Sequence, residues 1–373
     1  GSNNTAVGVA ALSNNTTPSG MTAVGYQALY LNTTGSDNVA VGNTALKDNT
    51  TGYENVAVGV QALWQNTTAD RNTALGHNCL RVNTTADDNT AIGWYALINN
   101  SGSSNTAVGI YSLQGNKAGI HNSAFGYGSL NSNNVGNYNT SVGFQSSYYN
   151  TGSNYNTSVG YQSLFNNTSP NMVAVGRGSL YSNTTGVKNT AVGYFSLNAN
   201  LTGSYNSAFG YRTLSVNTNG NFNSAFGYRS LQANTIGIRN SAFGGYSLYT
   251  NTTGTDNTAV GYQSLYANTT GVNNTSVGRQ SLFTNNSGVN NTAVGYRSLY
   301  LNTSGNRNSA FGSYSLNANT TGVENTAVGF GSLQTNTIGT SNSAFGYQSL
   351  TSNTTGIRNT SAGYRSLYLN TIG

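Results

Sequence analysis

One phrase recurs along the chain at a fixed interval, and this repeat restricts the fold more than any other feature. "NTAVGYQSLYANTTGVN" at 257–273 returns as "NTSVGRQSLFTNNSGVN" at 274–290 and as "NTAVGYRSLYLNTSGNR" at 291–307. The glycine of the "AVG" phrase occurs in 22 copies, from Gly8 to Gly363, always 17 residues apart except for two steps of 16. A repeat this short cannot hold two helices and their turns, so helical solenoids are excluded.

The two shorter steps show which part of the repeat is a loop. Both lose a residue in the "NTTG" segment, as in "NNSG" at 99–102 and "NNTSPN" at 166–171. Surface loops tolerate length changes that packed strands do not, so we assign this segment to a loop. Composition does not change along the chain, and there is no linker or charged run. We therefore predict that residues 1–373 form a single continuous array of 22 repeats without a globular domain boundary.

The residue types favour strands over helices or disorder. β-branched and aromatic residues are frequent, only 2 Pro occur, and no segment has the apolar spacing of a helix. Regularly placed Leu and an aromatic content of 11% are atypical of disordered chains. The predicted fold is all-β: a parallel β-solenoid (β-roll) of 22 coils with about 17 residues in each. Coils that stack at about 4.8 Å would give an elongated rod of roughly 100 Å.

Two apolar positions per repeat predict the core, with positions counted from the "AVG" glycine. Position −1 is Val, Ile, Leu or Phe in 21 of 22 copies, and position +4 is Leu in 21 of 22. We expect both columns to face inward, and the leucine column includes Leu29, Leu197 and Leu265. The glycine never varies, as at Gly25, Gly193 and Gly261. Either a bend with positive φ or a close approach between backbones would require it.

Asparagine occupies two further columns. Position +7 is Asn in all 22 copies, including Asn15, Asn32, Asn49, Asn183, Asn268 and Asn370. Position −4 is Asn in 20 copies, and the exceptions, Met21 and Met172, follow Pro18 and Pro170. We expect a turn altered by Pro to present no amide there. Stacked asparagines can hydrogen-bond from amide to amide, so we predict ladders along the stack. The same asparagines form N-x-[ST] sequons, and a buried ladder amide cannot carry a glycan.

Other columns are predicted to face outward and are candidates for an interface. Position +1 is aromatic in 13 copies and +5 in 10, with Tyr26, Tyr262 and Tyr296 among them. These rings would form either an exposed stripe that stacks sugars or packs against another rod, or a flat cover over the coil edges. Position −2 is Ala or Ser in all 22 copies. If it faces outward, its small side chains (Ala191, Ala208, Ala225) predict close contact with another chain; the alternative is that it faces inward because the coil is narrow.

No constellation of residues indicates catalysis. His77 and His121 lie in different repeat phases, Cys79 at +3 reads as a small buried residue, and the 8 acidic residues are scattered. No "GK[ST]" phosphate loop is present, and no Ser lies with a base and an acid in a unique setting. We expect no catalytic, cofactor-binding or metal-binding residues and no enzyme. A net charge of +6 is too sparse to bind nucleic acid.

Arginines gather weakly at position +2, at Arg212, Arg229, Arg297 and Arg365. A solvated column of Arg and Gln explains them better than a stripe for acidic sugars.

The stretch "TAVGYQALYLNTTG" at 22–35 resembles the repeats of tail-fibre-domain proteins of phages and of bacteria such as Bacteroidetes. It is more distantly similar to the head repeats of trimeric autotransporter adhesins, whose shorter unit reads like "NSVAIG". The resemblance implies an extracellular or virion fibre that projects a binding element. We see no signal peptide, membrane anchor, coiled-coil stalk or C-terminal chaperone domain in these residues. We therefore expect the shaft segment of a longer protein or the repeat unit of a filament.

The sequence thus predicts a structural segment: the shaft of an adhesin, a phage tail-fibre-like appendage or a self-assembling surface filament. It would mediate attachment or assembly outside the cell, on the cell surface or on a virion. Expected partners are copies of itself, in a bundle or an end-to-end filament, and surface glycans. We expect no nucleic acid and no membrane span. The alternative is a ligand-binding solenoid such as an ice-binding protein, although its threonine rank at −3 is interrupted by Ser and Val.

Overall fold

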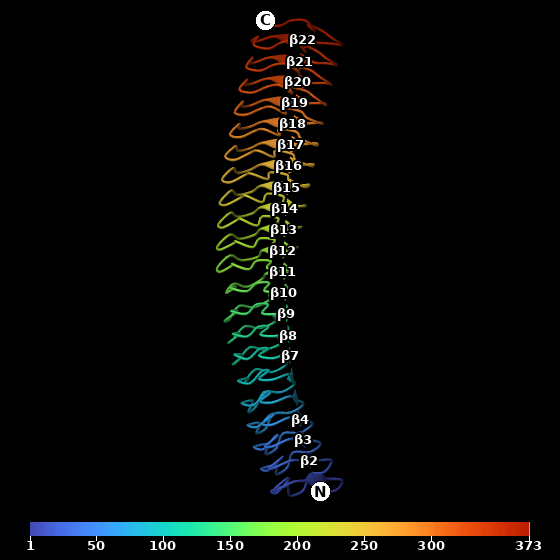
Figure 1. Ribbon diagram of the computed structural model, residues 1–373, viewed down its shortest axis with the longest axis vertical. Helices are drawn as coiled ribbons and strands as arrows, with labels where there is room; N and C mark the ends of the chain where they lie inside the picture. Colours follow the sequence, from blue (N-terminus) through green and yellow to red (C-terminus); the bar gives the residue numbers. More distant parts are fainter. Residues whose placement is uncertain (373) are drawn as a thin grey trace. The chain divides into compact units, whose positions relative to one another are not determined.

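The computed structural model describes residues 1–372, which contain 22 three-residue strands and no helix. The chain divides into two compact units, Gly1–Val187 and Lys188–Gly373. Within each unit, every strand pairs in parallel with the next strand along the chain, so that the coils stack one on another (Figure 1). Each unit is therefore an all-β parallel β-solenoid, which confirms the predicted fold class. Continuity of the array from one unit into the other stays a prediction.

The strands all occupy positions −3 to −1 of the repeat. The first unit holds β1 (Thr5–Val7), β2 (Thr22–Val24), β3 (Val39–Val41), β4 (Val56–Val58), β5 (Thr73–Leu75), β6 (Thr90–Ile92), β7 (Thr106–Val108), β8 (Ser123–Phe125), β9 (Thr140–Val142), β10 (Thr157–Val159) and β11 (Val173–Val175). The second unit holds β12 (Thr190–Val192), β13 (Ser207–Phe209), β14 (Ser224–Phe226), β15 (Ser241–Phe243), β16 (Thr258–Val260), β17 (Thr275–Val277), β18 (Thr292–Val294), β19 (Ser309–Phe311), β20 (Thr326–Val328), β21 (Ser343–Phe345) and β22 (Thr360–Ala362).

Positions +4, +3 and −2 are buried in the interior of the coils, as Ala28 at +3 shows with no exposed surface. Leu29, Leu197 and Leu265 have no exposed surface, as predicted for the leucine column. Position −2 is equally buried, since Ala23 and Ala259 also have no exposed surface. Where +4 is Ser147, its Oγ lies 2.7 Å from the Oγ of Ser158 at −2, so the small −2 column packs against the +4 column.

The prediction that position −1 faces inward is wrong. Phe125 is 40% exposed and Leu75 is 46% exposed, although both stand in the apolar column at −1. Successive side chains of a strand point to opposite faces, so an inward −2 forces −1 and −3 outward. The prediction failed because it took the near-invariance of apolar residues at −1 as a sign of burial, whereas Val and Phe are favoured in strands on either face.

The invariant glycine meets both conditions that the sequence suggested. At Gly193, φ is +133°, and a Cβ atom would lie 2.3 Å from the carbonyl oxygen of Gly210 in the next coil. No L-residue is comfortable at this φ, and the contact is with backbone, which cannot move aside. Each strand can therefore end in a bend directly against the bend of its neighbour.

The turn after the glycine places non-glycine residues in the left-handed region. Gln27 and Leu29, at +2 and +4, have φ of 51° and 50°. As a result the Gln27 N–H donates to the Val9 carbonyl of the preceding coil, whereas the Leu29 N–H donates to the Ala45 carbonyl of the following coil. Left-handed φ costs about 1–2 kcal/mol per residue. Burial of Leu, about 1.5–3 kcal/mol, and the inter-coil hydrogen bonds offset this cost.

Two asparagine ladders run through the stack and confirm that prediction. At +7, the Asn49 Nδ2 donates to Asn32 Oδ1 at 2.7 Å and to the Gly52 carbonyl at 2.9 Å. At −4, the Asn55 backbone N–H donates to Asn38 Oδ1 at 2.9 Å. These amides are fully buried, so each ladder satisfies polar groups that would otherwise destabilise the core.

Met21 and Met172 interrupt the −4 ladder only in part. Both side chains are buried, at 1% and 0% exposure. Their backbone N–H groups still donate to the preceding asparagine, Met21 to Asn4 Oδ1 at 3.0 Å and Met172 to Asn156 Oδ1 at 3.0 Å. The amide is lost, as predicted, but the backbone keeps its place in the ladder.

The "NTTG" segment forms an outer loop that absorbs the deletions. In full-length coils its first threonine links to the next coil, as where Thr33 Oγ1 donates to the Thr50 carbonyl at 2.9 Å. In the shorter coil at 99–102, the asparagine ladder continues, since Asn116 Nδ2 donates to Asn100 Oδ1 at 2.8 Å. The register of β6 and β7 also holds, with Thr90 opposite Thr106. The loop therefore changes length without disturbing the core.

Candidate functional site

The surface beside the glycine bend is built from three neighbouring columns, at positions +1, +2 and +5. The Arg297 guanidinium lies 5.3 Å from the ring centre of Tyr296 at +1 and 5.0 Å from that of Tyr300 at +5. The residue at +2 thus lies between the two aromatic columns and fills the space between them. What occupies +2 and +5 in a given coil decides whether this surface is filled or hollow.

Aromatic rings in the +1 and +5 columns pack on the equivalent ring of the adjacent coil. Phe144 and Tyr161 at +1 have centroids 5.2 Å apart and an interplanar angle of 6°. Tyr249 and Tyr266 at +5 have centroids 5.2 Å apart at 14°. Tyr26 and Tyr262 are nevertheless 50% and 47% exposed. Many of these rings thus pack on a ring of the adjacent coil, while Tyr26 and Tyr262 still leave about half of their surface to solvent.

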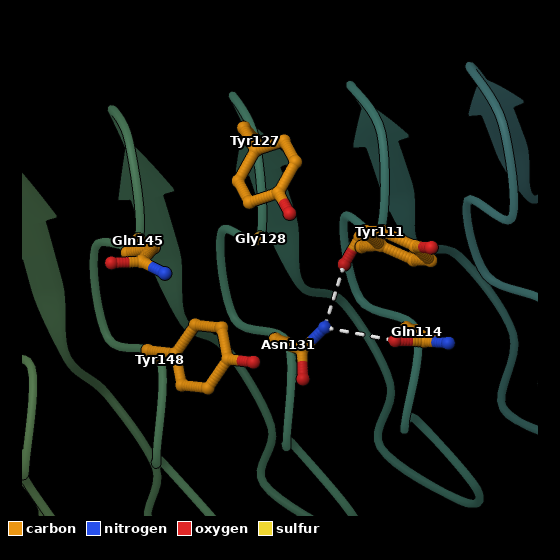
Figure 2. A pocket seen from close by; sticks show the side chains of 7 residues that line it. All are labelled: Tyr111, Gln114, Tyr127, Gly128, Asn131, Gln145 and Tyr148. Atoms are coloured by element: carbon orange, nitrogen blue, oxygen red, sulfur yellow. Dashed lines mark hydrogen bonds between the residues drawn. The ribbon is translucent and has the colours of Figure 1, made fainter.

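A hollow of about 330 Å³ interrupts these columns in the first unit. It lies where two consensus side chains are missing from one coil: Gly128 stands at +2, and Asn131 stands at +5. The adjacent coils carry Tyr111 and Gln145 at +2, which project on either side of the gap (Figure 2). The hollow is therefore a direct result of two small residues in an otherwise filled surface.

Three tyrosines form the aromatic part of its lining. Tyr127 at +1 and Tyr148 at +5 show their ring faces and direct their hydroxyl groups inward, while Tyr111 stands edge-on (Figure 2). Tyr127 is 43% exposed and stacks on Phe144 at 5.2 Å. Tyr148 is partly buried and stacks on Phe165 at 5.5 Å. The rings of Tyr127 and Tyr148 are thus each held in place by stacking on a ring of the following coil.

Three amides form the polar part of the lining. Asn131 Nδ2 donates to the Tyr111 carbonyl and to Gln114 Oε1, both at 3.1 Å (Figure 2). Gln145 Oε1 accepts a hydrogen bond from Gln162 Nε2 at 2.9 Å, and its own amide nitrogen points toward Gly128 (Figure 2). Both side chains are thus oriented by neighbours. They present amide groups to whatever occupies the hollow.

The Tyr148 hydroxyl in the hollow is a neutral hydrogen-bonding group. Partial burial, with smaller contributions from Tyr149 and Tyr127, raises the pKa of the Tyr148 hydroxyl above its usual value of 10.0. None of the seven lining residues carries a charge at neutral pH. The site can therefore offer ring faces, hydroxyls and amides, but no charge that would attract an ion.

The structure corrects the predicted interface at position −2. Ala191, Ala208 and Ala225 have no exposed surface, so they lie inside the coil and cannot contact another chain. The column is small because it faces the leucine column within a narrow interior. Tyr26 and Tyr262 do reach the surface, as predicted, and Tyr296 is partly exposed. A contact made by these tyrosines stays a prediction.

The single cysteine and the two histidines occupy separate places. Cys79 is buried, and its Sγ lies 2.6 Å from the Gly93 carbonyl. His77 packs against Tyr95, and His121 stacks on Tyr138. Within residues 1–372, no group of three or more His, Cys, Asp or Glu side chains is arranged to hold a metal ion.

The arginine column at +2 packs on tyrosines. Arg212 and Arg229 lie 5.7 and 5.4 Å from the ring centres of Tyr211 and Tyr228. Arg365 lies 5.5 Å from that of Tyr364 and donates from Nε to Gln348 Oε1 at 2.9 Å. The column of Arg and Gln is thus part of the aromatic surface and not a separate charged stripe.

Sequence reasoning missed the hollow. Its signal was present, since Gly128 and Asn131 depart together from the larger residues that are common at +2 and +5. Recognising it required knowing that +2 lies between +1 and +5 on the surface, which only the turn geometry reveals.

Comparison of the chain with protein-family models and with curated proteins finds no match. In residues 1–372 there is no helix long and apolar enough to cross a lipid bilayer.

Proposed function

We propose that this chain is a structural segment of an extracellular fibre or filament, such as the shaft of an adhesin or of a phage-like appendage. The observation that carries the proposal is the sameness of the coils. In each unit the same backbone groups and the same buried asparagines bond from coil to coil, so the pattern can extend without a special residue. Such an array is suited to holding other elements at a distance.

The surface chemistry supports a role outside the cell. Charged residues make up only 6% of the chain, and three ion pairs occur in residues 1–372, all on the surface. Stability then rests on hydrogen bonds inside the coils and on apolar burial, which salt and pH affect little. The resemblance of "TAVGYQALYLNTTG" to fibre repeats points to the same location. Copies of the chain, in a bundle or a filament, are the partners we propose for assembly.

Small-angle X-ray scattering of the purified chain tests this proposal. The repeat predicts an elongated particle of roughly 100 Å if all coils stack at about 4.8 Å. We also expect this particle to resist proteases, because short loops leave little backbone free. A compact, protease-sensitive particle would contradict a structural role. Labelling of the native cell or virion surface with an antibody against the chain tests the location.

Ice binding remains a second candidate because of the outer face of the strands. On β16–β18, Thr258, Thr275 and Thr292 at −3 form one rank in register, and Val260, Val277 and Val294 at −1 form another. Regular ranks of Thr and Val on one sheet face are compatible with ordered water. Phenylalanines at −1, as at Phe226, make the face uneven on other strands. A measurement of thermal hysteresis decides this candidate, since a structural fibre gives none.

A further inference from the structure

We propose that the hollow around Gly128 and Asn131 binds one sugar ring of a neutral glycan. This inference goes beyond the structural role and does not depend on it. It rests on the chemistry of the lining, on the size of the hollow and on the way its side chains are held.

The lining matches the two kinds of surface on a pyranose. A sugar ring has an apolar face of C–H groups, which packs on aromatic rings, and the rings of Tyr127 and Tyr148 both line the hollow (Figure 2). It also has hydroxyls at its rim, which both donate and accept hydrogen bonds. Tyrosine hydroxyls can do the same, and the Gln145 amide nitrogen can donate. Asn131 can only accept, at Oδ1, because its two N–H groups already donate to Tyr111 and Gln114.

The absence of charge in the lining selects among sugars. All seven lining residues are uncharged, so a carboxylate or sulfate would lose water without gaining a cation. Neutral sugars carry no such cost. We therefore infer a neutral hexose or N-acetylhexosamine, not a sialic or uronic acid.

Size and rigidity also fit a small ligand. About 330 Å³ lies at the lower end of the range for small-molecule sites and suits a single ring better than a long chain. The backbone around the hollow is fixed by inter-coil bonds, such as Gly128 N–H to the Ile110 carbonyl at 2.9 Å and Gln145 N–H to the Tyr127 carbonyl at 2.8 Å. Side chains on a rigid frame bind with little loss of conformational freedom.

The repeat itself provides a variant that fills the hollow. Gly128→Gln together with Asn131→Tyr restores residues that other coils carry at +2 and +5, as in Gln263 and Tyr266. Gly128 has φ of +59°, close to the 50° of Gln145 at the same position, so Gln fits the backbone. A Cβ at Gly128 would lie 3.2 Å from the Tyr148 ring, so the ring must shift by a few tenths of an ångström to admit the new side chain.

The control variant is Asn317→Tyr. Asn317 also stands at +5, and its Nδ2 donates to the Arg297 carbonyl at 2.9 Å, as Asn131 Nδ2 does to the Tyr111 carbonyl. This variant therefore makes the same exchange away from the hollow. Circular dichroism should show the same β-structure in the wild type and in both variants.

The test is binding of the whole chain to an array of immobilised neutral and acidic glycans. NMR titration then follows, with the monosaccharides contained in the glycans that bind. We expect binding to one or more neutral glycans, with a dissociation constant on the order of millimolar for a single hexose. The filled variant should lose at least ten-fold in affinity, whereas Asn317→Tyr should bind as the wild type does. Binding to no neutral glycan, preference for acidic glycans, or unchanged binding by a folded filled variant would each overturn the proposal.

Discussion

The buried leucine at +4 shows how one residue can hold an unfavourable backbone. Leu265 has φ of 52° and no exposed surface. The left-handed region costs about 1–2 kcal/mol for such a residue, and full burial of a Leu contributes about 1.5–3 kcal/mol. The two nearly cancel, so the margin comes from the Leu265 N–H, which donates to the Ser281 carbonyl at 2.9 Å. The side chain therefore offsets the cost of the turn.

Leu265→Ala should destabilise the chain by about 2–5 kcal/mol, because it leaves a cavity where the column was filled. Thr270→Ala in the exposed loop should change stability by less than about 0.5 kcal/mol. Urea unfolding followed by circular dichroism measures both. Equal tolerance at the two positions would show that the leucine column is not the core.

Cys79 gives a prediction with a defined pH dependence. Burial raises the pKa of its thiol from 9.0 to about 11, against weaker opposing hydrogen bonds from the backbone at Gly93 and Ala96. The unfolded thiol loses its proton near pH 9 and the folded thiol near pH 11. The stability linked to this group is therefore full below pH 9 and is lost as the pH rises through 11.

Between pH 8 and pH 10 the wild type should lose about 1 kcal/mol more stability than Cys79→Ala, which has no titrating group at this position. Ala is the residue at +3 in other coils, such as Ala62, so this variant should fold. Iodoacetamide should label the folded wild type only after denaturation. Rapid labelling of the native chain at pH 8 would show that the thiol is accessible.

At the scale of the strand, position −2 faces the interior of the coil, while positions −3 and −1 face outward. In β12–β14 the −2 residues are buried, while the −3 residues Thr190, Ser207 and Ser224 are partly exposed. Replacing Ala191, Ala208 and Ala225 with Lys should unfold the surrounding coils, because a buried lysine has no partner there. Lys at the three −3 positions should leave the fold intact. Thermal unfolding by circular dichroism compares the two triple variants.

A folded and monomeric chain with Lys at −2 would mean that this column is on the surface after all. Light scattering on the same samples separates that outcome from aggregation of an unfolded chain.

The strand also shows what the sequence could and could not predict. The period, the parallel pairing, the inward Leu29 column and the Asn32 ladder follow from residues that recur with little or no change. The orientation of −1 does not, because Val and Phe are favoured in strands on either face. The side of the coil that −1 faces cannot be inferred from the side that +4 faces, because the bend between them contains left-handed residues. The hollow at Gly128 was hidden for the same reason, since it depends on which columns are neighbours.

At the scale of the whole chain, stability should vary from coil to coil. In stacked repeats each coil contacts only its neighbours, so a coil with one neighbour opens more easily. The coil after β22 illustrates this, with Leu367 48% exposed where the same position in interior coils, as at Leu265, is buried. We expect amide hydrogen exchange, measured by mass spectrometry on the 373-residue chain, to be faster near β1 and β22 than near β6 or β17. Uniform exchange at all four places would indicate one all-or-none transition.

The side-chain amides of the +7 asparagine ladder also give each unit a dipole along the stack. Asn268 Nδ2 donates to Asn251 Oδ1, Asn285 Nδ2 to Asn268 Oδ1, and Asn302 Nδ2 to Asn285 Oδ1, always toward the preceding coil. The amide dipoles therefore add along the stack, with their positive ends toward the N-terminal side, as peptide dipoles do in an α-helix. A second copy placed in line would meet an attractive field head to tail and a repulsive one head to head. The amides that close the core thereby give the coil stack a polarity.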